Sequence, residues 1–247
     1  EIIAQARKGL GDAQWASITQ LRQKDLPRAH NLGPGVNSSD ADFGGYFLGD
    51  TLYYASYRFS YEKDKHLPQR NLIQLMQLNP GMEEAVLLGG PFNQQDQHTS
   101  YTTFSLDRQT MYYCVCEYQT VSAIRCDIVR SRRDASGFWG PPQPVHINEQ
   151  GYTTSQPAIG IHPETGEEIL YFASDRPHPE AAGGMDIYYG LVEPDGDVYV
   201  AENFEAINSA DDDVTPYFHT LTRQFFFSSK GYRSFGGFDI FVSHFKE

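Results

Sequence analysis

Short apolar runs separated by turn-rich polar segments occupy residues 26–247 of the chain. In the third of four similar stretches the apolar runs are SQPAIGI, EILYFASD, MDIYYGLV and DVYVAENF, with HPETGE and EPDGD among the segments between them. Turns that combine Pro, Asp or Thr with Gly are typical of β-hairpins, because Gly supplies the positive φ that tight turns require. Helical 3.6-residue periodicity is absent from these stretches, so the pattern predicts four antiparallel strands in each.

Three sequence markers recur in step, at spacings of 53 to 60 residues. The first is an apolar phrase of the type LYFASDR, which begins at Leu52, Met111, Leu170 and Phe225. The second resembles DIYY and contains Ile73, Ile128, Ile187 and Ile240. The third is an Asn that closes an apolar run, at Asn37, Asn93, Asn148 and Asn208. A four-stranded unit of this length is the size of a propeller blade, so the markers predict an all-β propeller of four-stranded antiparallel blades.

The last repeat ends after its third strand, in FDIFVSHFKE, and a counterpart of the missing fourth strand lies near the N-terminus in RAHNLGPGVN. We therefore expect residues 28–33 to pair with the strand that contains Ile240 and to close a ring of four visible blades. A larger ring, of which the chain contains only four blades, is the alternative.

A different pattern precedes the repeats. Asp12 can cap a helix in AQWASITQLR, which presents Trp15 and Ile18 on one side. We expect two parts in the chain: a helical segment over residues 1–25, at the end of an upstream helical region, and the propeller over residues 26–247.

Small hydroxyl residues followed by a cation recur at the end of the second strands. The members of this repeat signature are Ser56, Arg58, Ser174, Arg176, Ser229 and Lys230. An Asp opens three of the third strands, at Asp127, Asp186 and Asp239. Hydroxyl and carboxylate side chains at strand ends commonly bind backbone groups. We interpret both sets as structural corners, in preference to catalytic groups for the first and calcium ligands for the second.

Motifs of catalytic or metal sites are missing from the sequence. There is no nucleophile elbow, no H-E-x-x-H and no phosphate-binding Gly-rich loop. The run Asp211–Asp213 lacks the spacing of a calcium loop and is interpreted as a solvated loop. We therefore predict no metal and no cofactor, while a pair of carboxylates suited to glycoside hydrolysis remains an open alternative.

Composition and charge narrow the choice of partners. A formal net charge of −13 argues against nucleic acid, which requires clustered Lys and Arg. The first residues lack both an initiator Met and the pattern of a signal peptide, so the sequence is interpreted as part of a longer protein. Of the three cysteines, Cys114 is expected to be a buried filler. Cys116 and Cys126 could face each other across a hairpin, but they are expected to pack without forming a disulfide.

The stretches LYFASDRPHPEAAGGMDIYY and FFFSSKGYRSFGGFDIFV are similar to the repeats of WD-like propellers of the TolB-related kind. Together with NLGPGVNSSDADFGGYFLGDTLYYASYR, they resemble the propeller of OmpA-family cell-envelope lipoproteins of Bacteroidota, a group that includes the PorE proteins of type IX secretion. The resemblance covers roughly residues 26–247 and is weakest in the second repeat, where MYYCVCE lacks both Ser and Arg.

That resemblance implies a non-enzymatic docking scaffold in the periplasm, associated with the outer membrane. Its partners would be other envelope or secretion proteins, and peptidoglycan would be bound only through a domain that this chain does not contain. Two alternatives belong to other classes. The first is a carbohydrate-processing or peptidase-accessory propeller with a ligand in the central channel, and the second is a carbohydrate-binding module with a funnel lined by exposed Tyr or Trp.

Overall fold

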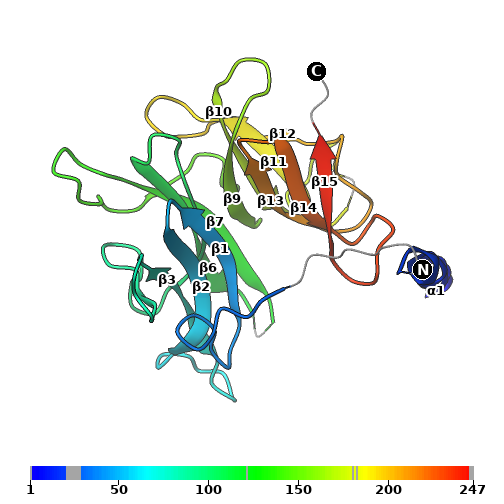
Figure 1. Ribbon diagram of the computed structural model, residues 1–247, viewed down its shortest axis with the longest axis horizontal. Coiled ribbons are helices and arrows are strands. Elements are labelled where there is room, and N and C mark those ends of the chain that lie inside the picture. The colour runs from blue at the N-terminus through cyan, green and yellow to red at the C-terminus, as the bar shows by residue number, and fades with distance from the viewer. Residues whose placement is uncertain (1, 21–28, 121, 180, 182, 245–247) are drawn as a thin grey trace.

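The computed structural model describes residues 2–20, 29–120, 122–179, 181 and 183–244 of the chain. Within these residues the protein has one helix and four antiparallel sheets, which are arranged around a common centre like the blades of a propeller (Figure 1). The predicted all-β propeller is therefore confirmed.

The four sheets follow one another in chain order, and each is a meander. Blade 1 contains β1 (Asp42–Leu48), β2 (Thr51–Ser60), β3 (Asn71–Leu78) and β4 (Val86–Leu87). Blade 2 contains β5 (His98–Phe104), β6 (Thr110–Tyr118), β7 (Ile124–Arg132) and β8 (Gln143–Pro144). Blade 3 contains β9 (Thr154–Ile161), β10 (Glu168–Ser174), β11 (Asp186–Leu191) and β12 (Glu202–Asn203). Blade 4 contains β13 (Asp213–His219), β14 (Gln224–Ser229) and β15 (Asp239–His244).

The outer strand of blade 3 is shorter than the run DVYVAENF predicts. Only Glu202 and Asn203 pair with β11. The backbone N–H of Val198 is bound instead by the Asp197 carboxylate, which also accepts the N–H of His146 from the preceding blade. This stretch therefore connects two blades instead of extending one ladder, although the Val198 side chain is fully buried.

The core lies between successive blades: in the described residues one cluster joins blades 2 and 3, a second joins blades 3 and 4, and a third joins blades 1 and 2. Tyr112 of blade 2 packs with Phe172 of blade 3, and Tyr171, on the opposite face of β10, packs with Phe225 of blade 4. Blades 1 and 2 enclose a third cluster, which includes Leu75. The second strands of the two middle blades, β6 and β10, are therefore buried on both faces, and large apolar residues follow one another along them.

A repeated Asn ties each outer segment to the third strand of its blade. In each case the side-chain amide accepts a backbone N–H and donates to the carbonyl of the same residue, as another strand would. The pairs are Asn93 with Leu75 (2.8 and 2.8 Å), Asn148 with Ile128 (2.9 and 2.8 Å) and Asn208 with Ile187 (2.8 and 2.9 Å). We call these three pairs the Asn clamps. They give the third sequence marker a physical basis.

The expected closure of blade 4 by residues 28–33 is wrong for residues 29–33, and residue 28 lies outside the described residues. The segment folds on itself: Asn37 accepts the N–H of Leu32 through its side chain and donates its own N–H to the Gly33 carbonyl. The following Val36 is buried against blade 1, and its carbonyl accepts bonds from Tyr54 and Arg58. Among the described strands β15 therefore pairs only with β14.

One face of β15 is also open, because none of the described residues packs on it as the following blade does in blade 3. Ile240 is 77% exposed, whereas Ile187 at the same position of blade 3 is fully buried. In blade 3 the following blade and Ile207 cover that position. No corresponding cover for Ile240 exists in the described part of the chain, and its aliphatic side chain faces solvent.

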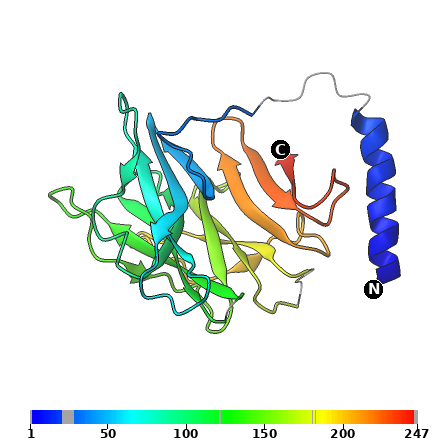
Figure 2. The same cartoon turned by 90° about the horizontal axis from the view of Figure 1, so that it is seen from below.

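The helix α1 (Ile2–Gln20) lies beside blade 4, apart from the ring (Figure 2). Trp15 contacts Phe235 at 5.3 Å between ring centroids, and Lys8 pairs with Asp211 at 2.5 Å. Asp12 lies within the helix instead of capping it, because the helix begins at Ile2. Over its described length the helix is too polar to cross a bilayer.

Candidate functional site

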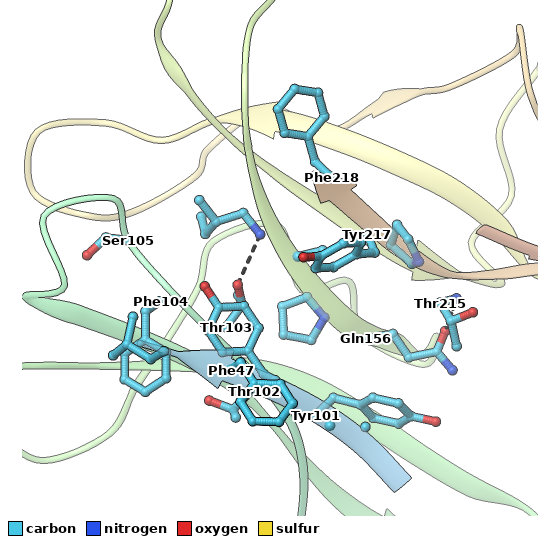
Figure 3. A pocket seen from close by; sticks show the side chains of 18 of the residues that line it. Phe47, Tyr101, Thr102, Thr103, Phe104, Ser105, Gln156, Thr215, Tyr217 and Phe218 are labelled. Carbon is cyan, nitrogen blue, oxygen red and sulfur yellow. Dashed lines mark hydrogen bonds between the residues drawn. The ribbon is translucent and has the colours of Figure 1, made fainter. Parts of the chain in front are cut away.

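A cleft of about 690 Å³ lies at the centre of the propeller. It is lined by the first strand of every blade, β1, β5, β9 and β13, and by residues of the turns that follow β5 and β13 (Figure 3). A single concave site to which all four blades contribute is the usual place for a ligand in a ring-shaped fold.

Each of these four strands is interrupted at the same point. The pairing with the second strand shifts register there, as in a β-bulge. One residue in each bulge has a positive φ: Gly44 (63°), Tyr101 (42°), Gln156 (58°) and Thr215 (52°). Such values cost little for Gly and about 1–3 kcal/mol for other residues, and bulges next to sites of function redirect side chains. The fold therefore holds three unfavourable backbone conformations at the cleft.

The four bulge residues form a continuous belt across the cleft. The Tyr101 ring lies so close to Gly44 that a Cβ there would approach it to 2.9 Å. The Tyr101 hydroxyl meets the Gln156 side chain, whose Oε1 accepts the N–H of Thr215 at 2.7 Å. Figure 3 shows these three side chains side by side along one wall. Neighbouring blades are thus connected through the groups that line the cleft.

Aromatic rings and hydroxyl groups lie above the belt. Tyr217 is 47% exposed and Phe47 65% exposed, so both present ring surface to the cleft. The Thr103 hydroxyl accepts the N–H of Ile159 at 3.1 Å and joins blades 2 and 3 (Figure 3). Burial raises the pKa of Tyr46 and that of Tyr101, so both phenols stay protonated and can donate hydrogen bonds at neutral pH.

The described lining of the cleft contains no Asp and no Glu, and Arg108 is its one charged side chain. Two carboxylates lie just outside it. Glu168 accepts the N–H of the lining residue Leu106 at 3.1 Å, and Asp107 follows Leu106 in the chain. Burial raises the pKa of Glu168, while the Ser105 hydroxyl lowers that of Asp107. Opposite shifts in two neighbouring carboxyl groups are typical of an acid and a base.

The Ser and Arg of the repeat signature are not part of the cleft lining and lie at the C-terminal end of the second strands. Arg176 donates to Ser174 Oγ at 2.9 Å, to the Ile147 carbonyl at 2.8 Å and to Thr154 Oγ1 at 2.9 Å. The same arrangement in blade 1 connects Arg58 with Ser56, Val36 and Asp42. Each Arg thereby fastens the incoming segment to its blade.

Blade 4 uses the corresponding positions differently. Lys230 pairs with Asp212 at 2.7 Å, and Ser229 Oγ accepts the N–H of Gly231 at 3.0 Å. The bond to the incoming segment comes instead from Tyr232, which donates to the Ile207 carbonyl at 2.9 Å.

The three Asp residues that open third strands also stay apart from the cleft lining. Asp186 is buried opposite Ser174 in the ladder and meets the Asn203 amide at 3.4 Å. Asp239 lies opposite Ser229 and accepts the N–H of Phe235 at 2.7 Å. Asp127 is half-buried, with Arg125 at 3.8 Å, and burial raises its pKa.

In the acidic run each carboxylate has a different neighbour. Asp211 pairs with Lys8, Asp212 with Lys230, and Asp213 is buried and accepts the N–H of Ser209 at 2.5 Å. The expected solvated loop is thus wrong for Asp213. Across the described residues no three His, Cys, Asp or Glu side chains gather in a way that could hold a metal ion.

The expectation for two of the cysteines is wrong. Cys116 and Cys126 form a disulfide between β6 and β7, where they stand directly opposite in the ladder with their Cα atoms 4.0 Å apart. Cys114 is buried with a free thiol, and burial raises its pKa to about 12. It accepts the N–H of Gln156 at 3.2 Å and so supports the belt.

Sequence reasoning missed the belt, although a signal was present. When the repeats are aligned, Gly44, Tyr101, Gln156 and Thr215 fall in phase in DFGGYF, SYTTF, SQPAIG and VTPYF. A Pro or a Gly follows three of them, which interrupts the strand pattern at one point in the repeat. The more conspicuous phrase of the second strands marks residues that form the core between the blades.

No protein-family model matches the sequence, and no curated protein matches it. Solved structures do. A thermostable family-43 glycoside hydrolase is 12% identical, with 82% of this chain and 71% of that one covered and a TM-score of 0.50. An α-L-arabinofuranosidase from Lactobacillus brevis is 13% identical, with 78% and 67% covered and a TM-score of 0.49. A GH32 β-fructofuranosidase of Bombyx mori is 10% identical, with 78% and 43% covered and a TM-score of 0.48.

Identities this low establish the propeller fold and nothing finer. The expected non-enzymatic docking scaffold is nevertheless corrected, because the fold is shared with glycoside hydrolases. The wide central cleft, rather than the outer faces of the blades, is also where the structure concentrates its unfavourable backbone conformations.

Proposed function

We propose that the protein is a carbohydrate-processing propeller that takes a glycan in its central cleft. The observation that carries this proposal is the belt of bulge residues, one from each blade, at the same height in the cleft. Unfavourable backbone conformations persist where the surrounding structure fixes them, and they cluster at binding and catalytic sites.

The chemistry of the lining suits a sugar. A pyranose or furanose ring has apolar C–H faces, for which the exposed rings of Tyr217 and Phe47 offer a surface. It also carries hydroxyl groups around its edge, for which Gln156, Thr215 and the phenol of Tyr101 offer donors and acceptors. An apolar surface with a few convergent polar groups is the general design of small-molecule sites.

Hydrolysis of a glycoside commonly requires two carboxylates that flank the bond. Asp107 and Glu168 are the pair that we assign to this chemistry, since they lie beside Leu106 at the edge of the cleft and their pKa values shift in opposite directions. The protonated form of Glu168 is favoured, so Glu168 is suited to act as the general acid. The ionised form of Asp107 is favoured, so Asp107 is suited to act as the general base or the nucleophile.

The first test is binding of short neutral oligosaccharides to the full chain, measured by titration calorimetry. Tyr217→Ala removes an exposed ring from the cleft, and we expect binding to weaken by about two- to twelvefold, the effect of about 0.5–1.5 kcal/mol from an aromatic contact. Tyr199→Ala is the matched control, because Tyr199 is 52% exposed and is not part of the cleft lining. Equal weakening in both variants, or no binding by the wild-type chain, contradicts the proposal.

The second test is cleavage of the oligosaccharides that bind. We expect Asp107→Asn and Glu168→Gln each to reduce the turnover of a bound glycan by at least about a hundredfold, in line with the loss of an acid or base catalyst. Turnover that persists in both variants would show that these two residues are not the catalytic pair.

A further inference from the structure

The charge at the cleft comes from Arg108, on the turn between β5 and β6. Its side chain is exposed, and its guanidinium has no hydrogen bond or ion pair within the described ranges of the chain. The backbone N–H of Arg108 is bound to the Ser105 carbonyl at 2.8 Å, so the turn itself is fixed while the side chain is available.

The backbone at this position makes an Arg unfavourable. The turn after the first strand has a left-handed residue in every blade: Gly49 (61°), Arg108 (63°), Gly166 (76°) and Arg223 (53°). Gly adopts this conformation freely, whereas a residue with a Cβ is strained in it. Arg223 has an internal partner, since its guanidinium donates to the Pro163 carbonyl. Arg108 has no such bond in the described residues, although its backbone has the same left-handed conformation.

The acidic groups near Arg108, Asp107 and Glu168, form no ion pair with it in the described residues and bind other groups. Asp107 Oδ1 accepts the Ser105 hydroxyl at 2.6 Å and the N–H of Gln109 at 2.9 Å. Glu168 Oε1 accepts the N–H of Leu106. In a protein with a net charge of −13, the cleft side of Arg108 is therefore a local site of positive charge without a described counter-ion.

We propose that the cleft binds a glycan that contains a uronic acid, whose carboxylate pairs with Arg108. The planar guanidinium matches a carboxylate through two parallel N–H···O bonds. The same sugar unit presents its ring to the aromatic surface of the cleft. The negative charge of its carboxylate explains the presence of an Arg at a backbone conformation that would be unstrained for Gly. This inference rests on the proposed function and specifies its substrate class.

The experiment compares tri-galacturonate with its methyl ester, which keeps the sugar rings and removes the charge. Titration calorimetry on the full chain at low salt is expected to give about tenfold tighter binding of the free acid, and the difference should shrink as salt is added. Arg108→Gly should abolish the preference, with a melting temperature at or above that of the wild type, because the strain is relieved.

Arg223→Gly is the matched control, since it makes the same change at the left-handed residue of the corresponding turn in blade 4, outside the cleft lining. It should keep the tenfold preference. Arg108→Lys retains the positive charge without the planar guanidinium. Its preference for the free acid over the ester should fall below about threefold. A preference that survives in Arg108→Gly, or that disappears in Arg223→Gly, overturns the inference.

The outcomes separate this inference from the proposed function. If the acid and the ester bind equally to the wild-type chain, the assignment of a uronic acid is wrong, while the proposed binding of a glycan is still supported. If neither they nor neutral oligosaccharides bind, the proposed function itself fails. A sulfated oligosaccharide that binds as tightly as galacturonate would overturn the assignment to a carboxylate.

Discussion

At the scale of single residues, His98 shows how burial sets a protonation state. Its side chain is 1% exposed, its Nδ1 accepts the N–H of Ile73 at 3.1 Å, and the rings of Tyr61 and Tyr118 stand edge-on against it. Burial lowers the pKa of His98 to about 4, because the cationic form would lose its hydration, and the positive charge of Arg70 adds to the effect.

This shift predicts a loss of stability in acid. An unfolded chain protonates His98 near pH 6.5, whereas the folded chain does so only near pH 4. Between these values the unfolded state binds more protons, so the free energy of unfolding falls as the pH falls, by up to about 3 kcal/mol from this residue. Urea denaturation of the wild type and of His98→Asn at pH 7 and pH 4.5 should show a smaller pH dependence in the variant. The same dependence in both proteins would contradict the assignment.

At the scale of elements, the Asn clamps replace strand pairing where the outer strands are only two residues long. β12 pairs through Glu202 and Asn203, and the adjacent Asn208 then satisfies both backbone groups of Ile187. The Asn208 side chain thus makes the two hydrogen bonds that a longer outer strand would make. This explains why the Asn recurs at one place in each repeat.

Removing a clamp is expected to leave buried backbone groups without partners. Asn208→Ala should lower the free energy of unfolding by about 2–3 kcal/mol, because a buried polar group without a hydrogen bond costs about 1–3 kcal/mol. Asn37→Ala is the control, since Asn37 serves a local turn near Leu32 rather than a third strand. Its expected effect is below about 1 kcal/mol, and chemical denaturation with an unchanged slope would measure both. Equal losses in the two variants would show that the clamp has no special role.

The elements also show what the sequence could and could not predict. The period of the apolar phrases was sufficient to place four blades, because packing against a neighbouring blade requires similar apolar runs in each. The belt could not be predicted from local preference, since Tyr101 and Gln156 adopt backbone conformations that their residue types disfavour. The disulfide depended on register, and a shift of one residue would have placed Cys116 and Cys126 on opposite faces.

At the scale of the whole molecule, residues 29–37, which precede the first strand, are attached to blade 1 rather than to blade 4. Val36 is buried there, and its carbonyl receives bonds from Tyr54 and Arg58. The helix touches blade 4 through the exposed pair Lys8–Asp211 and the contact of Trp15 with Phe235. Surface contacts of this kind contribute little to stability.

Two truncations should therefore differ. Removal of residues 1–28 is expected to change the melting temperature by no more than about 4 °C, the shift that about 1 kcal/mol produces in a chain of this size. Removal of residues 1–37 should cause a larger loss, because it also removes Val36 and the carbonyl that holds Arg58. Scanning calorimetry of both truncations tests this, and similar melting temperatures for the two would contradict the role given to Val36.

The open face of β15 has a consequence for the behaviour of the protein in solution. In the part of the chain that the structure describes, the outer edge of β15 is unpaired, and together with exposed Ile240 and Val242 it can pair with the edge of another molecule. At neutral pH the net charge of −13 keeps the molecules apart, but this repulsion vanishes near the isoelectric point of about 5.0. Colloidal stability should thus fail in mild acid, at the edge of blade 4, before the blades themselves unfold.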